Sequence, residues 1–273
     1  MSMELEPLTA KLGARVTGVS LRSLEAPDIE GIEAALREHM VIVFPEQFLR
    51  PEEQLSFARA LGEIDVAPFG PKHPEFPELT VLDQQAPRDQ GADAWHSDNT
   101  YLASPPRYTM LQAVQLPPVG GDTCWANMYE AHESLSEPLR RLTDELTATH
   151  DLTKMLTKAV EQGNSDADLD EMRRLHPPQH HPVARTHPDT GRRALFVNGN
   201  FTTRIDGLTE AENAALLPML LDTVNSPGIQ CRYRWEPGAL ALWDNRCLQH
   251  YAVPDYDSRR VMHRLTIAGD RPR

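Results

Sequence analysis

A histidine with an acidic residue two positions later is the simplest pattern in this chain that could hold a catalytic metal ion. Residues i and i+2 of an extended segment point the same way, so one such pair can supply two ligands from one side. Three pairs occur, and with 11 His and 40 acidic residues among 273 this number is close to chance. Spacing alone therefore does not select among them: His73-Pro74-Glu75, His96-Ser97-Asp98 and His187-Pro188-Asp189.

The surrounding sequence favours His96 and Asp98. The first pair lies in a Pro-rich loop, and the third is followed by Thr190-Gly191, which is typical of a turn. Residues 95–101 contain neither Pro nor Gly. Two His and one carboxylate on one face bind redox metals and leave coordination positions open. On the residues alone, His96 and Asp98 are the best candidates for metal ligands, and a surface His beside a turn-forming Asp stays open as the alternative.

The remaining ligand must come from elsewhere in the chain. His250 follows the strand-like run 240–243 and a polar turn, a position that suits the mouth of a barrel. A structural His in the core explains the same placement equally well. His263 is the rival ligand.

Two arginine side chains share one face of the strand-like run 260–267. Strand periodicity places Arg260, Met262, Arg264 and Thr266 together, with the other four residues opposite. A guanidinium keeps its charge, so a buried pair needs anions. Asp244 and Asp255 could supply them from within the protein; otherwise the two arginines bind carboxylate-like ligands.

These residues must be positioned by a strand-rich scaffold. Apolar spacing of three and four predicts helices over residues 28–40, 51–61 and 138–146, and Thr209 with Glu212 forms a capping box that opens another. Short apolar runs without regularly alternating helices argue against Rossmann and TIM arrangements and predict a mainly β barrel or sandwich with flanking helices. The predicted strands are 41–44, 79–82, 108–115, 194–197, 230–235, 240–243 and 261–267.

Composition excludes several classes of partner. The net charge of −13 argues against nucleic acid, which needs clustered Lys and Arg, and no apolar run is long enough for a membrane span. The start of the chain lacks the pattern of a secretory signal. Three cysteines without a CxxC pair suit a reducing compartment, so we expect a cytoplasmic protein.

No internal repeat or linker divides the chain, so residues 1–273 are expected to form a single domain. Residues 154–181 differ from the rest because they are polar, charged and weakly periodic. We interpret them as a partly helical excursion over the barrel. This segment is either an active-site lid or a plain surface insertion.

Five ordered motifs resemble the TauD/TfdA family of Fe(II)- and 2-oxoglutarate-dependent dioxygenases. The similarity runs from about residue 12 almost to the C-terminus, and five motifs at matching spacing are far more specific than one His-x-Asp pair. The motifs are WHSD at 95–98, GGDTCWAN at 120–127, FTTRI at 201–205, WDNRCLQHYA at 243–252 and RRVMHRLTIAGD at 259–270.

The resemblance implies a double-stranded β-helix, or jelly roll, surrounded by helices. It implies that His96, Asp98 and His250 bind Fe(II), and that Thr123 and Arg260 bind the distal carboxylate of 2-oxoglutarate. Decarboxylation of this co-substrate with O2 gives succinate and CO2 and hydroxylates a substrate C–H bond. Dimers or tetramers are common in the family, so a homo-oligomer is expected.

Arg264 resembles the residue that binds the anionic head of the substrate, which implies a sulfonate, sulfate ester or carboxylate. The rest of the implied pocket is Asn99, Tyr101, Leu156 and Phe201. Taurine-cleaving members also use a His and a Tyr, where an ungapped reading here gives Ala67 and Gly70. A loop shift could bring His73 into the first of these places.

Two other functions use the same residues. A zinc-dependent hydrolase could employ a His/Asp/His site, but it has no reason to hold two inward arginines and the GGDT motif. A non-catalytic jelly-roll protein could use the metal and arginines only to bind a ligand.

Overall fold

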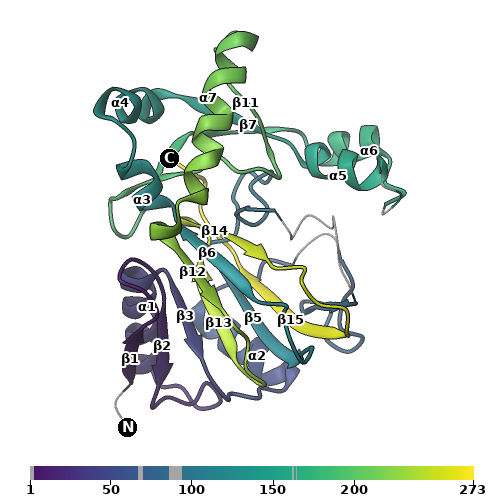
Figure 1. Ribbon diagram of the computed structural model, residues 1–273. Coiled ribbons are helices and arrows are strands. Elements are labelled where there is room, and N and C mark those ends of the chain that lie inside the picture. The colour runs from purple at the N-terminus through teal and green to yellow at the C-terminus, as the bar shows by residue number, and fades with distance from the viewer. Residues whose placement is uncertain (1–2, 67–69, 86–93, 162, 164) are drawn as a thin grey trace.

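A seven-stranded sheet forms the larger layer of the protein (Figure 1). The computed structural model describes residues 3–66, 70–85, 94–161, 163 and 165–273. In spatial order the strands of this sheet are β1 (Glu4–Pro7), β2 (Ala14–Thr17), β3 (Val41–Phe44), β13 (Leu240–Asp244), β5 (Tyr108–Gln115), β15 (Arg260–Ile267) and β4 (Thr80–Gln84).

A three-stranded sheet packs against the inner face of the larger one. Its order is β12 (Gln230–Tyr233), β6 (Thr123–Asn127) and β14 (Leu248–Ala252). Trp125 of β6 and Trp243 of β13 meet edge to face with ring centroids 5.8 Å apart, so the main core lies between the sheets. Smaller pairings add β11 (Thr202–Ile205), β7 (Thr147–His150) and β8 (Gln179–Pro182), and the hairpin of β9 (Ala184–Thr186) and β10 (Arg193–Leu195).

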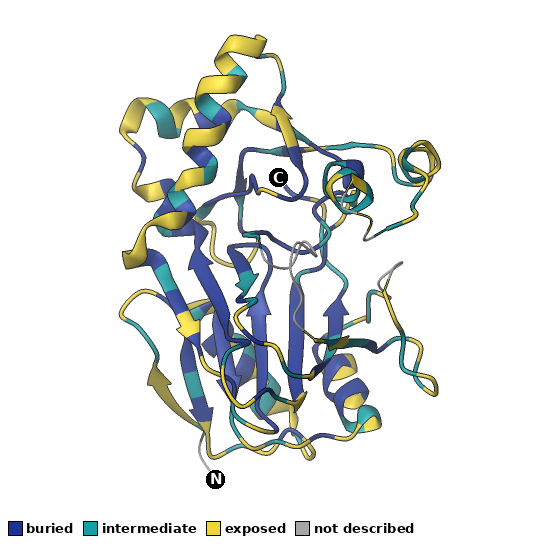
Figure 2. Cartoon of the chain, turned by 45° about the vertical axis from the view of Figure 1, so that its right-hand side comes forward, coloured by how far each residue is buried: buried dark blue, intermediate teal, exposed yellow. Residues whose placement is uncertain are grey.

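Two helices, α1 (Ala26–His39) and α2 (Pro51–Leu61), cover the outer face of the large sheet. Strand β13 packs on both faces of the large sheet because its side chains alternate between them. Leu240 and Leu242 pack with the helices, whereas Ala241 and Trp243 enter the core between the sheets. Figure 2 shows the central strands buried, with exposed residues on the helices, on the connecting loops and on the edge strand β1.

Strand β15 has the two faces expected from its sequence. Leu265 and Ile267 pack on the helix side, and Met262 belongs to the core between the sheets. Arg260 and Arg264 share the face of Met262 because they lie two residues before it and two residues after it. The strand therefore presents both guanidiniums to the interior of the sandwich.

The remaining helices lie beyond one end of the sandwich (Figure 1). They are α3 (Met128–Glu133), α4 (Glu137–Glu145), α5 (Leu152–Glu161), α6 (Leu169–Leu175) and α7 (Glu210–Asp222). The capping box between Thr209 and Glu212 opens α7 as predicted. None of the described helices is both long and apolar enough to cross a membrane.

The predicted strands and helices occur in the expected order, but several short strands were not predicted and the position of His250 differs. The sequence places His250 in a turn beyond the strand 240–243. In the structure the turn is only Asn245–Cys247, and His250 lies inside the next strand, β14. The polar residues Gln249 and His250 obscure this strand because both are buried: His250 faces Asp98, and Gln249 on the opposite face donates to Val197 O at 2.8 Å.

Candidate active site

The backbone brings His96 and His250 together. They form an isolated antiparallel bridge, with His96 N donating to His250 O at 3.1 Å and His250 N donating to His96 O at 2.8 Å. Directly opposite residues of an antiparallel pair point to the same side. Their rings accordingly lie 4.2 Å apart, centroid to centroid.

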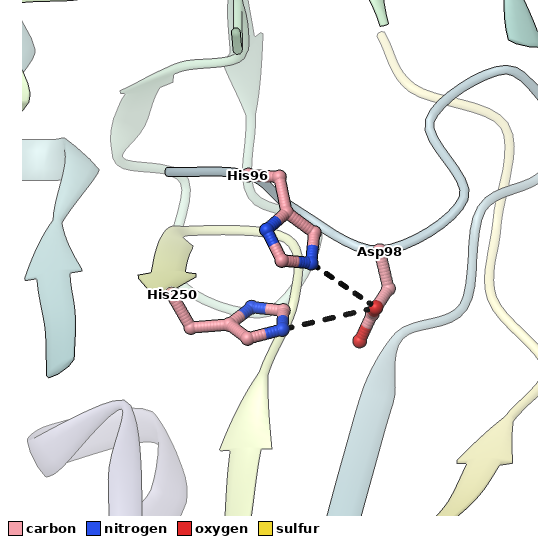
Figure 3. Close-up of side chains that lie close together, drawn as sticks. All are labelled: His96, Asp98 and His250. Carbon is pink, nitrogen blue, oxygen red and sulfur yellow. Dashed lines mark ion pairs between the residues drawn. The ribbon is translucent and has the colours of Figure 1, made fainter. Parts of the chain in front are cut away.

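Asp98 completes a buried cluster with the two histidines (Figure 3). Its Oδ1 lies 3.9 Å from His96 Nε2 and 3.8 Å from His250 Nε2. The ligand atoms of the three residues all lie within 4.8 Å of one another, so the cluster could hold a metal ion. The His-x-Asp motif supplies two of these three residues. His96 forms a strand-like bridge, whereas Asp98 lies at the start of a turn.

Two residues that the sequence analysis missed hold Asp98 in place. Asn245 accepts from Asp98 N at 2.7 Å and donates to Asp98 O at 3.0 Å, so the turn after β13 fixes the backbone of the carboxylate residue. Thr109 donates from its hydroxyl to Asp98 Oδ2 at 2.8 Å. The other oxygen, Oδ1, is thereby left facing the two imidazoles.

The protonation states suit a divalent cation. Burial and the neighbouring His96 lower the pKa of His250 to about 3, so its imidazole is neutral. Burial alone would raise the pKa of Asp98, but His250 and Arg264 outweigh it and lower that pKa to about 2. His96 Nδ1 donates to Ala94 O at 2.7 Å, so Nε2 is the ring nitrogen that faces Asp98. Neutral imidazole nitrogens and a carboxylate oxygen fit Fe(II) as well as Zn(II).

The other candidate histidines lie elsewhere. His263 faces α2, where its Nδ1 is 3.2 Å from Gln54 Nε2, and His73 packs against His263 with centroids 5.9 Å apart. His187 bonds Asp244 at 2.9 Å in a second buried group that also includes Cys247. Arg246 Nη2 forms an ion pair with Asp244 Oδ2 at 2.7 Å, so this group is an ion-pair network.

Arg260 is buried without the acidic partners considered from the sequence. Only 3% of it is exposed, and its Nε and Nη2 have no hydrogen-bond partner among the described residues. Asp255 instead pairs with Arg232 at 3.1 Å, and Asp244 pairs with Arg246. Burial lowers the pKa of Arg260, and the ring of Tyr256 lies 5.9 Å from its guanidinium. A buried guanidinium whose nitrogens lack partners among the described residues is suited to bind an anionic ligand.

Thr123 has a hydroxyl proton available beside Arg260. Trp235 Nε1 donates to Thr123 Oγ1 at 3.0 Å, so a lone pair is occupied and the hydroxyl proton can be donated. Gly121, two residues earlier, lies so close that a Cβ there would come within 3.0 Å of Arg260 Cδ and Nε. The glycine of the GGDT motif thus allows Arg260 to lie against the segment that leads into Thr123.

Arg264 lies on the metal side of the same strand. Its Nη1 is 3.4 Å from Asp98 Oδ1. Burial raises the pKa of the Tyr101 phenol, and the positive charge of Arg264 opposes this rise. The phenol therefore lies close enough to the guanidinium to feel its charge. The second inward arginine is therefore adjacent to the candidate metal ligands.

The four remaining pocket residues form a partly apolar wall. Tyr101 and Phe201 pack together with ring centroids 5.3 Å apart, and Leu156 of α5 joins their cluster. Asn99 has a positive φ of 49°, and its buried Nδ2 lacks a partner among the described residues. Ala67 lies outside the described residues. Gly70 is described and lies next to Thr80, where a Cβ would be 3.5 Å from Thr80 Cγ2.

Comparisons with known proteins agree with this arrangement. The family model described as "Taurine catabolism dioxygenase TauD, TfdA family" matches residues 4–266. An alpha-ketoglutarate-dependent sulfate ester dioxygenase from Pseudomonas putida is 37% identical over 100% of this chain and 91% of its own. An (S)-phenoxypropionate/alpha-ketoglutarate-dioxygenase from Sphingobium herbicidovorans is 34% identical over 98% of this chain and 96% of its own.

A solved structure agrees in fold as well as in sequence. A taurine dioxygenase from Burkholderia xenovorans superposes with a TM-score of 0.85 at 34% identity, covering 100% of this chain and 91% of that one. The expected jelly roll with flanking helices is confirmed by this match and by the two facing sheets. The chain therefore belongs to the TauD/TfdA family of dioxygenases.

Proposed function

We propose that the protein is an Fe(II)- and 2-oxoglutarate-dependent dioxygenase that hydroxylates a C–H bond of a small anionic substrate. The observation that carries this proposal is the buried Arg260, two of whose nitrogens have no hydrogen-bond partner among the described residues. A zinc hydrolase acts on one substrate and water, so it does not account for a buried anion site in addition to Arg264. A dioxygenase of this family requires one for its co-substrate.

His96, Asp98 and His250 are assigned as the metal ligands. Two neutral imidazoles and one carboxylate leave part of the coordination shell open for the co-substrate and O2. When bound there, Fe(II) and 2-oxoglutarate supply the oxidation of a C–H bond by O2, with release of succinate and CO2. The protein contributes the fixed carboxylate of Asp98, which Asn245 and Thr109 orient.

Thr123 and Arg260 are assigned to the distal carboxylate of 2-oxoglutarate. A guanidinium offers two parallel N–H donors to a carboxylate, and the Thr123 hydroxyl adds a third donor from β6. Burial makes these bonds strong and excludes water from the same wall.

Arg264 is assigned to the anionic head of the substrate, with Asn99, Phe201 and Leu156 along the rest of the substrate. The names of three similar proteins refer to a sulfate ester, a phenoxypropionate and taurine. All three compounds are small and carry one anionic group, which supports an anionic substrate for this chain. We also propose that residues 1–273 act as one domain with 154–181 as its lid, in a cytoplasmic dimer or tetramer.

Succinate release tests the proposal. The Fe(II)-loaded protein would be given 2-oxoglutarate under air with taurine, other alkylsulfonates, alkyl sulfates, and aryloxy or alkyl carboxylates. Stimulation by one class is expected. Asp98→Ala should abolish release with an unchanged melting temperature, and Arg264→Ala should keep slow release without substrate but lose the stimulation.

Each alternative function predicts a different result. Binding of iron and 2-oxoglutarate without any succinate would favour a binding protein. Thermal stabilisation by zinc alone, together with hydrolysis of an ester substrate, would favour a hydrolase. Full activity of Asp98→Ala would contradict the ligand assignment.

A further inference from the structure

The loop between β14 and β15 lies directly on the turn that leads into β6. We call residues 253–257 of this loop the strap. Asp255 Oδ1 accepts from Gly121 N at 2.9 Å. Gly120 has a φ of +83°, and a Cβ there would lie 2.6 Å from Asp255 O and Oδ1, so glycine is needed for the strap to come this close. Asp255 therefore packs on both glycines of the GGDT motif.

A half-exposed arginine ties the strap to the same turn. Arg232 of β12 donates from Nε to Asp122 Oδ2 at 2.7 Å and from Nη2 to Asp255 Oδ2 at 3.1 Å. Val253 N adds a 2.9 Å bond to Asp122 O. The Arg232 side chain is 54% exposed, and ion pairs at such positions contribute little to the stability of a whole fold. Their loss should therefore loosen the strap without unfolding the protein.

Arg260 lies against two residues that adjoin Asp255. A Cβ at Gly121 would come within 3.0 Å of Arg260 Cδ and Nε. The ring of Tyr256 lies 5.9 Å from the guanidinium carbon, and Tyr256 is 9% exposed. Burial raises the pKa of Tyr256, and the charge of Arg260 and a hydrogen bond with it oppose this rise. Asp255 is bonded to Gly121 and precedes Tyr256 in the chain, so it fixes both neighbours of the guanidinium.

The nitrogens of Arg260 that lack a partner among the described residues, Nε and Nη2, form one edge of the guanidinium. Two parallel N–H groups on one edge bind a carboxylate bidentately. This pair of bonds depends on the orientation of the guanidinium plane, so a small rotation weakens both bonds together. Asp255 is taken up by Gly121 and Arg232, so it supports Arg260 without occupying that edge.

We propose that Asp255 is a positioning residue of the 2-oxoglutarate site: by fixing Gly121 and the strap, it holds Arg260 in the orientation that binds the distal carboxylate. The inference rests on the proposed function and adds a residue that acts through Arg260. It follows that Asp255 affects the binding of 2-oxo acids that carry a distal carboxylate. Binding of the 2-oxo acid group itself, which is assigned to the metal, should not depend on Asp255.

Calorimetric titration of the Fe(II)-loaded protein under anaerobic conditions tests this role. The probes are 2-oxoglutarate and 2-oxobutyrate, which has the same 2-oxo acid group but no distal carboxylate. Asp255→Ala should raise the Kd of 2-oxoglutarate about tenfold, the lower end of the effect of residues that orient metal ligands, and that of 2-oxobutyrate less than about twofold. Asp255→Asn should keep most of the affinity, because its amide oxygen can still accept from Gly121 N.

A second variant and a matched control accompany Asp255→Ala. Arg232→Met removes the other anchor of Asp255 and should raise the Kd of 2-oxoglutarate about two- to fivefold, as expected for an exposed ion pair, without changing that of 2-oxobutyrate. The control is Asp83→Ala. Asp83 of β4 forms a comparably exposed pair, at 2.6 Å, with Arg259, the neighbour of Arg260. Asp83→Ala should leave both Kd values unchanged.

The outcomes separate this inference from the proposed function. If the wild type prefers 2-oxoglutarate and both Asp255→Ala and Arg232→Met keep that preference, Asp255 does not position Arg260. An equal loss for the two 2-oxo acids, or an equal loss in Asp83→Ala, would also overturn the role. A preference for 2-oxoglutarate that depends on Asp255, without succinate release by the wild type under air, would support the role of Asp255 and contradict the dioxygenase.

Discussion

The two oxygens of Asp98 have different partners, and this difference is set by Thr109. Thr109→Val removes the 2.8 Å bond to Oδ2 while keeping the shape of the side chain. Oδ2 would then lose its fixed orientation. Because residues that hold a metal ligand typically contribute 10- to 100-fold in affinity, we expect Fe(II) to bind about tenfold more weakly.

A second buried threonine provides the control for this variant. Thr143 of α4 is fully buried and donates to Arg140 O at 2.9 Å, away from the candidate site. Thr143→Val should lower stability and leave the Fe(II) affinity unchanged. Equal affinities for wild type and Thr109→Val, measured by competition with a chelator, would remove Thr109 from the site.

The hydrogen bond from Trp235 occupies a lone pair of the Thr123 hydroxyl and so directs its proton to another acceptor. Trp235→Phe removes the indole donor, so Thr123 can use its proton on another acceptor. Loss of a neutral hydrogen bond predicts a KM for 2-oxoglutarate about two- to tenfold higher with little change in kcat. Trp125→Phe is the control, because its buried Nε1 has no partner in the described part of the chain. A similar KM rise in both variants would point to general loosening of the core.

The sequence motifs identified the residues that carry the chemistry better than the residues that hold them in place. His96, Asp98, His250 and the two arginines stand out because metal ligands and buried cations are restricted residue types. Thr109 has no such signal in the sequence. Its role depends on which residue faces it in the fold, and the register of its strand is set by the whole sheet.

At the scale of elements, buried strands and one amphipathic helix were the easiest to predict. The strands 41–44 and 108–115 and the helix 51–61 were predicted with the bounds observed. Strand β14 was missed because its polar residues are buried, and β7, β8 and β11 were missed because they are short and polar. Elements that build a polar site break the apolar alternation on which prediction depends.

The anchoring of α6 gives a prediction about the proposed lid. Arg173 of α6 donates to Asp151 Oδ2 at 2.7 Å and to Thr153 Oγ1 at 2.9 Å, where α5 begins. Arg173→Ala removes this link, so amide hydrogen exchange in residues 169–175 should become about five- to tenfold faster. Arg174→Ala is the control, since Arg174 pairs at 3.8 Å with Glu171 of its own helix. Equal exchange in the two variants would mean that Arg173 does not anchor α6.

At the scale of the whole molecule, buried histidines limit stability in acid. His181 is 1% exposed and its Nε2 bonds Thr100 O at 2.9 Å and Leu102 O at 3.0 Å, while Nδ1 has no partner among the described residues. A proton on Nδ1 would therefore have no acceptor there. Burial lowers the pKa of His181 from 6.5 to about 4.

The pH dependence follows from this difference between the folded and unfolded pKa. Above pH 6.5 the imidazole is neutral in both states, and its full contribution to stability is present. Between pH 6.5 and 4 the unfolded chain binds a proton that the folded protein does not, so the unfolding free energy falls by about 3 kcal/mol. His181→Gln keeps a donor for Thr100 O and should reduce this slope in urea unfolding of the metal-free protein. The adjacent His180, exposed and paired with Asp206 at 2.8 Å, supplies the control variant His180→Gln. An unchanged slope in His181→Gln would assign the acid sensitivity to other buried histidines, of which His150 is the nearest, with ring centroids 5.1 Å apart.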